Sequence, residues 1–200
     1  MLLSEQQSDA LTELINIACS RTAASLSDLT SQRVGLDLPK VSVQPSNMLA
    51  PTLSGFVTGD VATVHQTFTG ALAGDALLLL EYDGAVRLAD LLTDGQSGAS
   101  QLDESGREVL MEVGNILLNT CLSMFGDVLQ VHVAFSMPRL KLEAINELVA
   151  SLVTGKEELR YALVIYTQFR LSQNAVSGYI VIVLGVASLD RLLLAIEALG

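Results

Sequence analysis

Two Glu–Asn pairs are the residues of this sequence whose types and spacing best suit chemistry. Asn16 follows Glu13 by three residues, and Asn115 follows Glu112 by three residues. An asparagine carboxamide has both a donor and an acceptor, so it can hold a water molecule in a fixed orientation. A glutamate carboxylate repels anions and pairs with cationic side chains. Each pair therefore combines a group that orients water with a group that contacts a cation.

The pairs belong to a longer pattern that occurs twice. It consists of an acid, three residues, Glu, two residues, Asn, twenty-two residues and Pro, and the two copies are offset by 99 residues throughout. The copies are Asp9, Glu13, Asn16 and Pro39, then Glu108, Glu112, Asn115 and Pro138. Internal repeats are often structural, so the repeat alone is also compatible with a duplicated scaffold.

Both copies begin in a segment with helical periodicity. The predicted apolar stripes are Leu11, Leu14, Ile15, Ala18, Thr22, Leu26 and Leu29, then Leu110, Val113, Leu117, Cys121, Met124 and Val128. The Glu and Asn residues lie on the opposite faces, where polar side chains are most often simply solvated. We expect Ser4 and Gln7 to cap the first helix and Asp103 the second, with Ser105 and Glu108 as an alternative capping box.

Composition limits the function classes. Half of the 200 residues are hydrophobic, which predicts a globular fold. A net charge of −11 argues against binding to nucleic acid or to an anionic membrane surface. No signal peptide is recognised at the N-terminus, and we expect Cys19 and Cys121 to be buried free thiols in a reducing cytoplasm. We expect the uncharged segment 171–189 to be a buried strand rather than a membrane span.

The remaining segments predict the same plan in both halves, separated by a linker at 94–98. The predicted strands are 40–43, 61–68, 75–81, 129–135, 161–169 and 178–185, the long helices end near residues 32 and 126, and the shorter helices are 85–92, 142–152 and 189–199. We expect a loop around Pro45 and Pro51. The interpretation is one α/β (α+β) domain over 1–200, built from repeats at about 1–98 and 99–200. Its strands form one continuous, mainly antiparallel sheet, with the two long helices packed on one face.

Other residues that could do chemistry form no recognisable site. His65 and His132 lie in or beside predicted strands at unrelated spacings, and we expect both to be structural. No Cys/His cluster predicts zinc. The glycines Gly70, Gly74 and Gly98 lack the lysine of a Walker phosphate-binding loop.

The repeated pattern resembles the signature of the CheC/CheX/FliY family of bacterial chemotaxis phosphatases. The first copy matches it completely, whereas Glu108 replaces the family's Asp or Ser in the second copy. The resemblance also covers the central hairpin at 70–78 and the helix at 85–92. Two motif copies without an added domain resemble CheC more than single-motif CheX or the longer FliY.

This resemblance implies a pseudo-two-fold CheC-like fold and hydrolysis of the phospho-aspartate of a CheY-like response regulator. It implies that Glu13 and Glu112 dock the regulator, and that Asn16 and Asn115 position the attacking water, as a Gln does in GTPases. Asp9, Glu108, Pro39 and Pro138 would support the motif. No cofactor of its own is implied, because Mg²⁺ would be held by the response regulator.

Two other interpretations stay open. The chain could be a non-catalytic adaptor that binds a phosphorylated response regulator or a CheD-type receptor deamidase. It could also be a purely structural duplicated domain.

Overall fold

The computed structural model describes residues 3–93, 101–153, 160–171 and 174–198. Its centre is an eight-stranded sheet in the order β1-β7-β8-β4-β3-β5, with β2 also paired to β7 and β6 also paired to β3. The strands are β1 Val34–Leu36, β2 Lys40–Pro45, β3 Asp60–Gly70, β4 Gly74–Glu81, β5 Val133–Phe135, β6 Arg139–Ala144, β7 Arg160–Leu171 and β8 Asn174–Gly185. All of these strand pairs are antiparallel. The predicted mixed fold with a continuous antiparallel sheet is confirmed.

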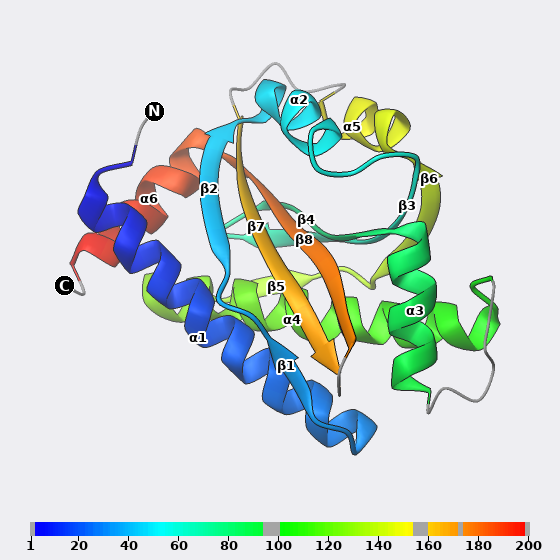
Figure 1. Cartoon of the computed structure of the whole chain (residues 1–200). Coiled ribbons are helices and arrows are strands. Elements are labelled where there is room, and N and C mark those ends of the chain that lie inside the picture. The colour runs from blue at the N-terminus through cyan, green and yellow to red at the C-terminus, as the bar shows by residue number, and fades with distance from the viewer. Residues whose placement is uncertain (1–2, 94–100, 154–159, 172–173, 199–200) are drawn as a thin grey trace.

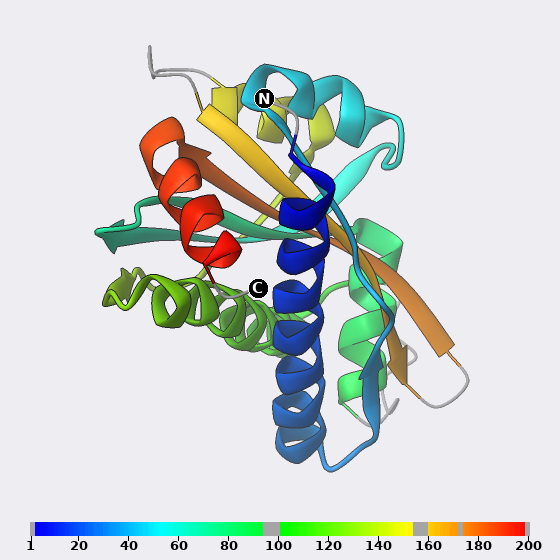
Figure 2. The ribbon, with the colours of Figure 1, turned by 90° about the vertical axis from the view of Figure 1, so that its left-hand side faces the viewer.

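Helices cover both faces of the sheet (Figures 1 and 2). They are α1 Glu5–Thr30, α2 Leu49–Ser54, α3 Tyr82–Leu92, α4 Glu104–Leu129, α5 Ile145–Val153 and α6 Val186–Glu197, with a 3-10 turn at Ser46–Met48. The helices α1, α3, α4 and α6 share one core with the sheet, whereas α2 and α5 contribute to a second core. The expected packing of both long helices on the same face is therefore confirmed.

Alternation along the strands explains these two cores. Leu78 and Leu80 of β4 face α4 and its neighbours, whereas Leu77 and Leu79 face α2 and α5. Both faces of the central strands are apolar, as expected for strands covered on each side by helices. The predicted apolar stripes are largely correct, but Leu29 is exposed and does not join the core.

The same element order occurs twice along the chain. Helix, strand, strand, short helix, strand, strand and helix run from α1 to α3, and again from α4 to α6. The strands β1 and β6 and the helix α2 were missed because each is too brief to show a clear periodic pattern. The loop predicted around Pro45 and Pro51 is wrong, since Pro45 ends β2 and Pro51 lies in α2. The predicted linker at 94–98 lies outside the described residues.

Capping residues set the starts of the long helices. Ser4 and Gln7 form a reciprocal capping box, and the Asp103 side chain accepts a hydrogen bond from the Gly106 N–H. The alternative capping box with Glu108 is wrong, because Asp103 already occupies the N-cap. Glu108 therefore lies inside the second turn of α4, with no capping function.

Some boundaries differ from the predicted ones because backbone geometry overrides the hydrophobic pattern. α4 continues to Leu129 and ends in a left-handed residue, Gln130, so the strand predicted from Leu129 begins only at Val133. The predicted helix 142–152 is a strand to Ala144 and a helix only from Ile145. The apolar segment 171–189 contains β8 and the start of α6, so the expected buried strand is confirmed within the part that is described.

Among the residues that the structure describes, one helix could span a membrane by length and composition alone. It is α4, which has a mean hydropathy of 1.4 over its 18-residue window, and 56% of that window is buried inside the fold. A core helix that packs against a sheet meets the same criterion.

The two cysteines are buried free thiols, as expected. Burial raises the pKa of Cys19 to about 11 and raises the pKa of Cys121 still further. Because the thiolate is the reactive form, we expect the native protein at pH 8 to react with a thiol reagent at least about tenfold more slowly than the denatured chain. A kinetic titration with and without denaturant measures this difference, and equal rates would contradict it.

Gly114 sets the distance between α4 and β3. A Cβ at this position would lie 2.5 Å from Cγ1 and 2.6 Å from Cβ of Val64. We expect Gly114→Ala to lower the free energy of unfolding by about 1–2 kcal/mol, because the overpacking cost exceeds the gain of about 1 kcal/mol in helix propensity. Urea unfolding measures the effect. Ser123→Ala, at an exposed position of the same helix, should leave stability nearly unchanged.

Candidate functional site

A polar cluster surrounds the second motif asparagine. Asn115 of α4 accepts two hydrogen bonds on Oδ1, one from Gln66 Nε2 of β3 at 3.1 Å and one from Asn119 Nδ2 at 2.9 Å. The same Gln66 nitrogen donates to the backbone oxygen of Ser136 at 3.1 Å. Gln66 is only 1% exposed. A single buried amide therefore joins the motif helix to the loop that precedes Pro138.

The two lone pairs of the Asn115 carbonyl oxygen are used inside the protein. Its amide nitrogen makes no hydrogen bond within the described chain and is not among the buried polar atoms that lack partners. Asn115 therefore offers N–H donors to an incoming group. In contrast, Oε1 of Gln66 is buried without a hydrogen-bond partner. Such a group typically lowers the free energy of unfolding by about 1–3 kcal/mol.

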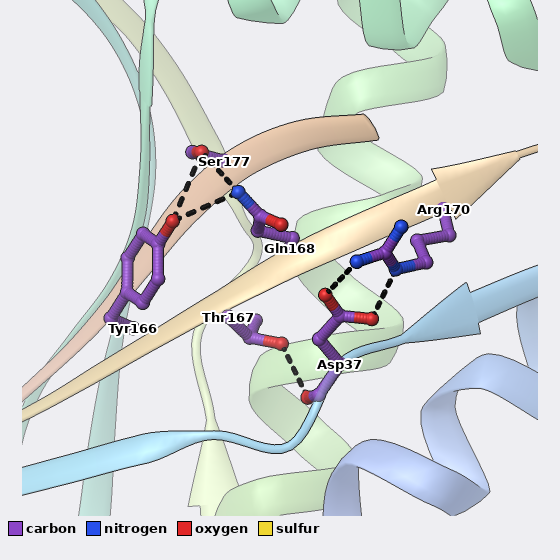
Figure 3. A network of polar contacts seen from close by, with 6 residues as sticks. All are labelled: Asp37, Tyr166, Thr167, Gln168, Arg170 and Ser177. Atoms are coloured by element: carbon purple, nitrogen blue, oxygen red, sulfur yellow. Dashed lines mark hydrogen bonds and ion pairs between the residues drawn. The ribbon is translucent and has the colours of Figure 1, made fainter. Parts of the chain in front are cut away.

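The first motif asparagine lies in a different environment. Arg139 and Lys40, which follow the two motif prolines, pair with His65 of β3 and Tyr166 of β7. The next residues along β3 and β7, Gln66 and Thr167, therefore occupy equivalent positions in the two halves. Thr167 Oγ1 donates to the backbone oxygen of Asp37 at 2.9 Å (Figure 3). The Asn16 carboxamide has no hydrogen-bond partner among the residues that the structure describes.

Helix spacing explains part of this difference. The residue that precedes Asn115 is Gly114, which allows α4 to approach Val64 of β3 closely. The residue that precedes Asn16 is Ile15, which is buried in the core. A bulky side chain needs more room than a glycine between helix and sheet. The Thr167 side chain is also shorter than that of Gln66 and makes no hydrogen bond to Asn16, in contrast to the bond from Gln66 to Asn115.

A bidentate ion pair fixes the loop that precedes Pro39. Arg170 donates two hydrogen bonds to the Asp37 carboxylate (Figure 3). Nε donates to Oδ1, and Nη2 donates to Oδ2 at 2.6 Å. Hydrogen bonding to Arg170, strengthened by its charge, lowers the pKa of Asp37. The Asp37 N–H also donates to the Gln168 backbone oxygen at 3.0 Å. These contacts join the β1–β2 loop to β7.

The other motif residues lie largely where the pattern predicts. The acids are exposed, namely Asp9, Glu13, Glu108 and Glu112. Asn16 and Asn115 are half-buried, at the border between the exposed and the buried helix face. Pro39 and Pro138 directly precede β2 and β6, as expected for residues at strand entry. Each motif therefore places a solvated carboxylate one helical turn before a carboxamide that water can reach.

Gln66 was not predicted as part of the second site. A single glutamine within a strand carries no local motif, and its equivalent in the other half is a threonine. Its position between apolar residues Val64 and Phe68 on the same strand face is the only available signal, because a buried amide needs partners.

Other features of the chain do not converge on the motif residues. His65 lies 3.3 Å from a carboxylate oxygen of Asp75, which is the structural arrangement expected, whereas His132 is exposed. Within the described ranges, no group of three or more His, Cys, Asp or Glu could hold a metal ion. A hollow of about 390 Å³ includes Phe56, Tyr166 and Tyr179, but it contains none of the motif residues.

Comparisons with known proteins agree with the fold and with the repeated pattern. No family model matches the chain. The flagellar motor switch phosphatase FliY of Bacillus subtilis is 29% identical over 147 residues, which cover 72% of this chain and 38% of that protein. The CheY-P phosphatase CheC of Bacillus subtilis is 21% identical over 151 residues, which cover 74% of this chain and 72% of that protein.

Among solved structures, FliY of Thermotoga maritima has the same fold, with a TM-score of 0.77, 17% identity and complete coverage of both chains. At this identity, the structural match establishes the fold alone. The preference for CheC over FliY stays a prediction. The predicted resemblance to the CheC/CheX/FliY family is confirmed by the two sequence relatives, and the fold agrees with it.

Proposed function

We propose that the chain is a phosphatase that hydrolyses the phospho-aspartate of a CheY-like response regulator. The observation that carries this proposal is the duplicated arrangement of an exposed Glu one helical turn before a water-accessible Asn. The relatives FliY and CheC are named as phosphatases, and CheC as a phosphatase of CheY-P. The chain spans only 38% of the length of that FliY, so phosphatase activity is proposed for this chain and does not follow from the match alone.

The chemistry requires little covalent participation from the protein. An acyl phosphate already has a good leaving group, so acceleration requires an oriented water and stabilisation of the phosphoryl charge. Asn115 can donate from Nδ2 to the water or to a phosphoryl oxygen, and Asn16 can use both ends of its carboxamide. The response regulator would supply Mg²⁺, which neutralises phosphoryl charge when it is bound.

The glutamates fit docking better than chemistry. Glu13 and Glu112 are exposed, and a carboxylate next to a phosphoryl group is repelled by it. Each can instead pair with a cationic side chain on the response regulator, where a charge-assisted hydrogen bond would fix the register of the two surfaces. Asn16 and Asn115, one turn further along, would then reach the phosphorylated residue. We expect the reaction in the cytoplasm.

The direct test is the decay of a phosphorylated CheY-like receiver with and without the wild-type chain. Phosphate release or tryptophan fluorescence of the receiver follows the reaction. Decay that becomes faster in proportion to the concentration of the chain supports the proposal. Decay at the receiver's own rate, over the full concentration range, would refute it.

One observation favours a second function for the site on α4 that contains Glu112 and Asn115. Because Gln66 and Asn119 occupy Oδ1 of Asn115, that oxygen cannot accept a hydrogen bond from water without rearrangement. The site could therefore dock a phosphorylated receiver as an adaptor, without useful hydrolysis. Tight binding of the receiver combined with an unchanged decay rate would support this alternative.

A further inference from the structure

Two large apolar side chains are strongly exposed. Met137 is 84% exposed and Leu38 is 79% exposed, more than any other large hydrophobic residue that the structure describes. Single exposed apolar residues are ordinary on protein surfaces and need no explanation. The position of these two residues in the fold distinguishes them.

Met137 and Leu38 occupy equivalent positions in the two halves of the chain. Each directly precedes a motif proline, Pro138 or Pro39, and each lies in the short connection between paired strands, β5–β6 or β1–β2. Chance would have to expose a large apolar side chain twice at the same place in the repeat. The recurrence indicates a requirement of the two motif repeats to which these loops belong.

Both loops are held by specific hydrogen bonds. In the second half, the Ser136 N–H donates to the Thr67 backbone oxygen at 2.9 Å, and the Thr67 N–H donates to Ser136 Oγ at 3.0 Å. In the first half, Thr167 and Arg170 hold Asp37 (Figure 3), and the Asp37 N–H donates to the Gln168 backbone oxygen. The backbone is therefore fixed immediately before each exposed side chain, which reduces the entropy lost when a partner covers it.

The second loop borders its motif asparagine directly. Gln66 Nε2 is 3.1 Å from Asn115 Oδ1 and 3.1 Å from the Ser136 backbone oxygen, and Met137 is the next residue. A protein large enough to bring a phosphorylated side chain to Asn115 would extend across this loop. Burial of an exposed thioether or isobutyl group would then contribute to its binding.

We propose that Met137 and Leu38 are apolar contacts that hold a phosphorylated receiver protein on the two motif sites. Met137 serves the α4 site, which contains Glu112 and Asn115, and Leu38 serves the α1 site, which contains Glu13 and Asn16. This inference rests on the proposed function, because it takes the same partner. Each site would combine an acid that pairs with a cation, a carboxamide that faces the phosphoryl group, and one apolar contact at the rim. A polar rim with a small apolar contact is typical of transient protein interfaces.

The test separates the two sites and measures KM and kcat for a phosphorylated receiver. Met137→Ser is made in an Asn16→Ala background, and Leu38→Ser in an Asn115→Ala background. We expect each serine variant to raise KM about tenfold and to leave kcat unchanged, since the loss is in binding. Met48→Ser is the matched control, because Met48 is exposed in the segment before α2, away from the motif helices.

A second measurement distinguishes failure of this inference from failure of the proposed function. Binding of a beryllofluoride-loaded receiver is measured by titration for the wild type and for each variant. Normal KM and normal binding in both serine variants would overturn the inference while the phosphatase stands. Binding without hydrolysis, weakened by the serine variants, would refute the phosphatase and support the docking surface.

Two further outcomes overturn the inference. If the wild-type chain neither binds nor dephosphorylates the receiver, the proposed function and the surface both fail. If sedimentation shows a dimer that the two serine substitutions dissociate, the exposed pair forms a contact between copies of the chain instead.

Discussion

Replacement of both Asn16 and Asn115 by alanine is expected to return receiver dephosphorylation to the receiver's own rate. Each substitution removes the only carboxamide that its motif presents to solvent. Loss of one precisely placed hydrogen-bond donor at a reaction centre typically lowers kcat by about a hundredfold or more. Decay of the phosphorylated receiver, measured with the wild type, both single variants and the double variant, gives the size of the effect.

The single variants rank the two sites. A rate that falls mainly in Asn16→Ala would show that the unrestrained carboxamide is the more effective one, and the opposite result would favour the carboxamide held by Gln66. Asn146→Ala is the matched control, since Asn146 is an exposed asparagine on α5, outside both motifs. Activity of the double variant equal to that of the wild type would exclude both asparagines from the reaction.

The fold could be predicted from the sequence where physical signals are local. The capping residues Ser4 and Asp103 fix the starts of α1 and α4, and the apolar stripes identify their buried faces. Pairing of neighbouring strands, such as β3 with β4 and β7 with β8, followed from the sequence. Register and the pairing between the halves were not predictable, because they depend on contacts such as Thr67 with Ser136 that are remote in sequence. α4 continues past its predicted end at residue 126 and stops only at the left-handed residue Gln130, which composition alone did not reveal.

The candidate site was predictable only as far as the repeat extends. Glu13, Asn16, Glu112 and Asn115 follow from the pattern, and their catalytic functions stay predictions. The difference between the two sites did not follow from it. That difference depends on residues where the halves diverge, such as Gly114 against Ile15, and such residues acquire meaning only when the sheet brings them next to a motif helix.

Gln66 provides the sharpest test of that difference. Its amide nitrogen holds the Asn115 carbonyl in one orientation and at the same time holds the Ser136 loop. We expect Gln66→Leu, in an Asn16→Ala background, to lower kcat about tenfold and to leave KM nearly unchanged, because Asn115 loses its fixed orientation rather than its contact with the receiver. Rapid-mixing measurements over a range of receiver concentrations separate the two constants.

Stability distinguishes this positioning function from a merely structural one. Leucine has a similar volume and removes the buried, unpartnered Oε1 of Gln66, which offsets the loss of the two hydrogen bonds, so the melting temperature should change little. The matched control is Thr167→Val in an Asn115→Ala background, which alters the equivalent position in the half where Asn16 has no such partner. There we expect kcat to stay the same. A large drop in melting temperature of Gln66→Leu with normal kcat would assign Gln66 to the fold alone, and equal kcat losses in both variants would contradict the difference between the sites.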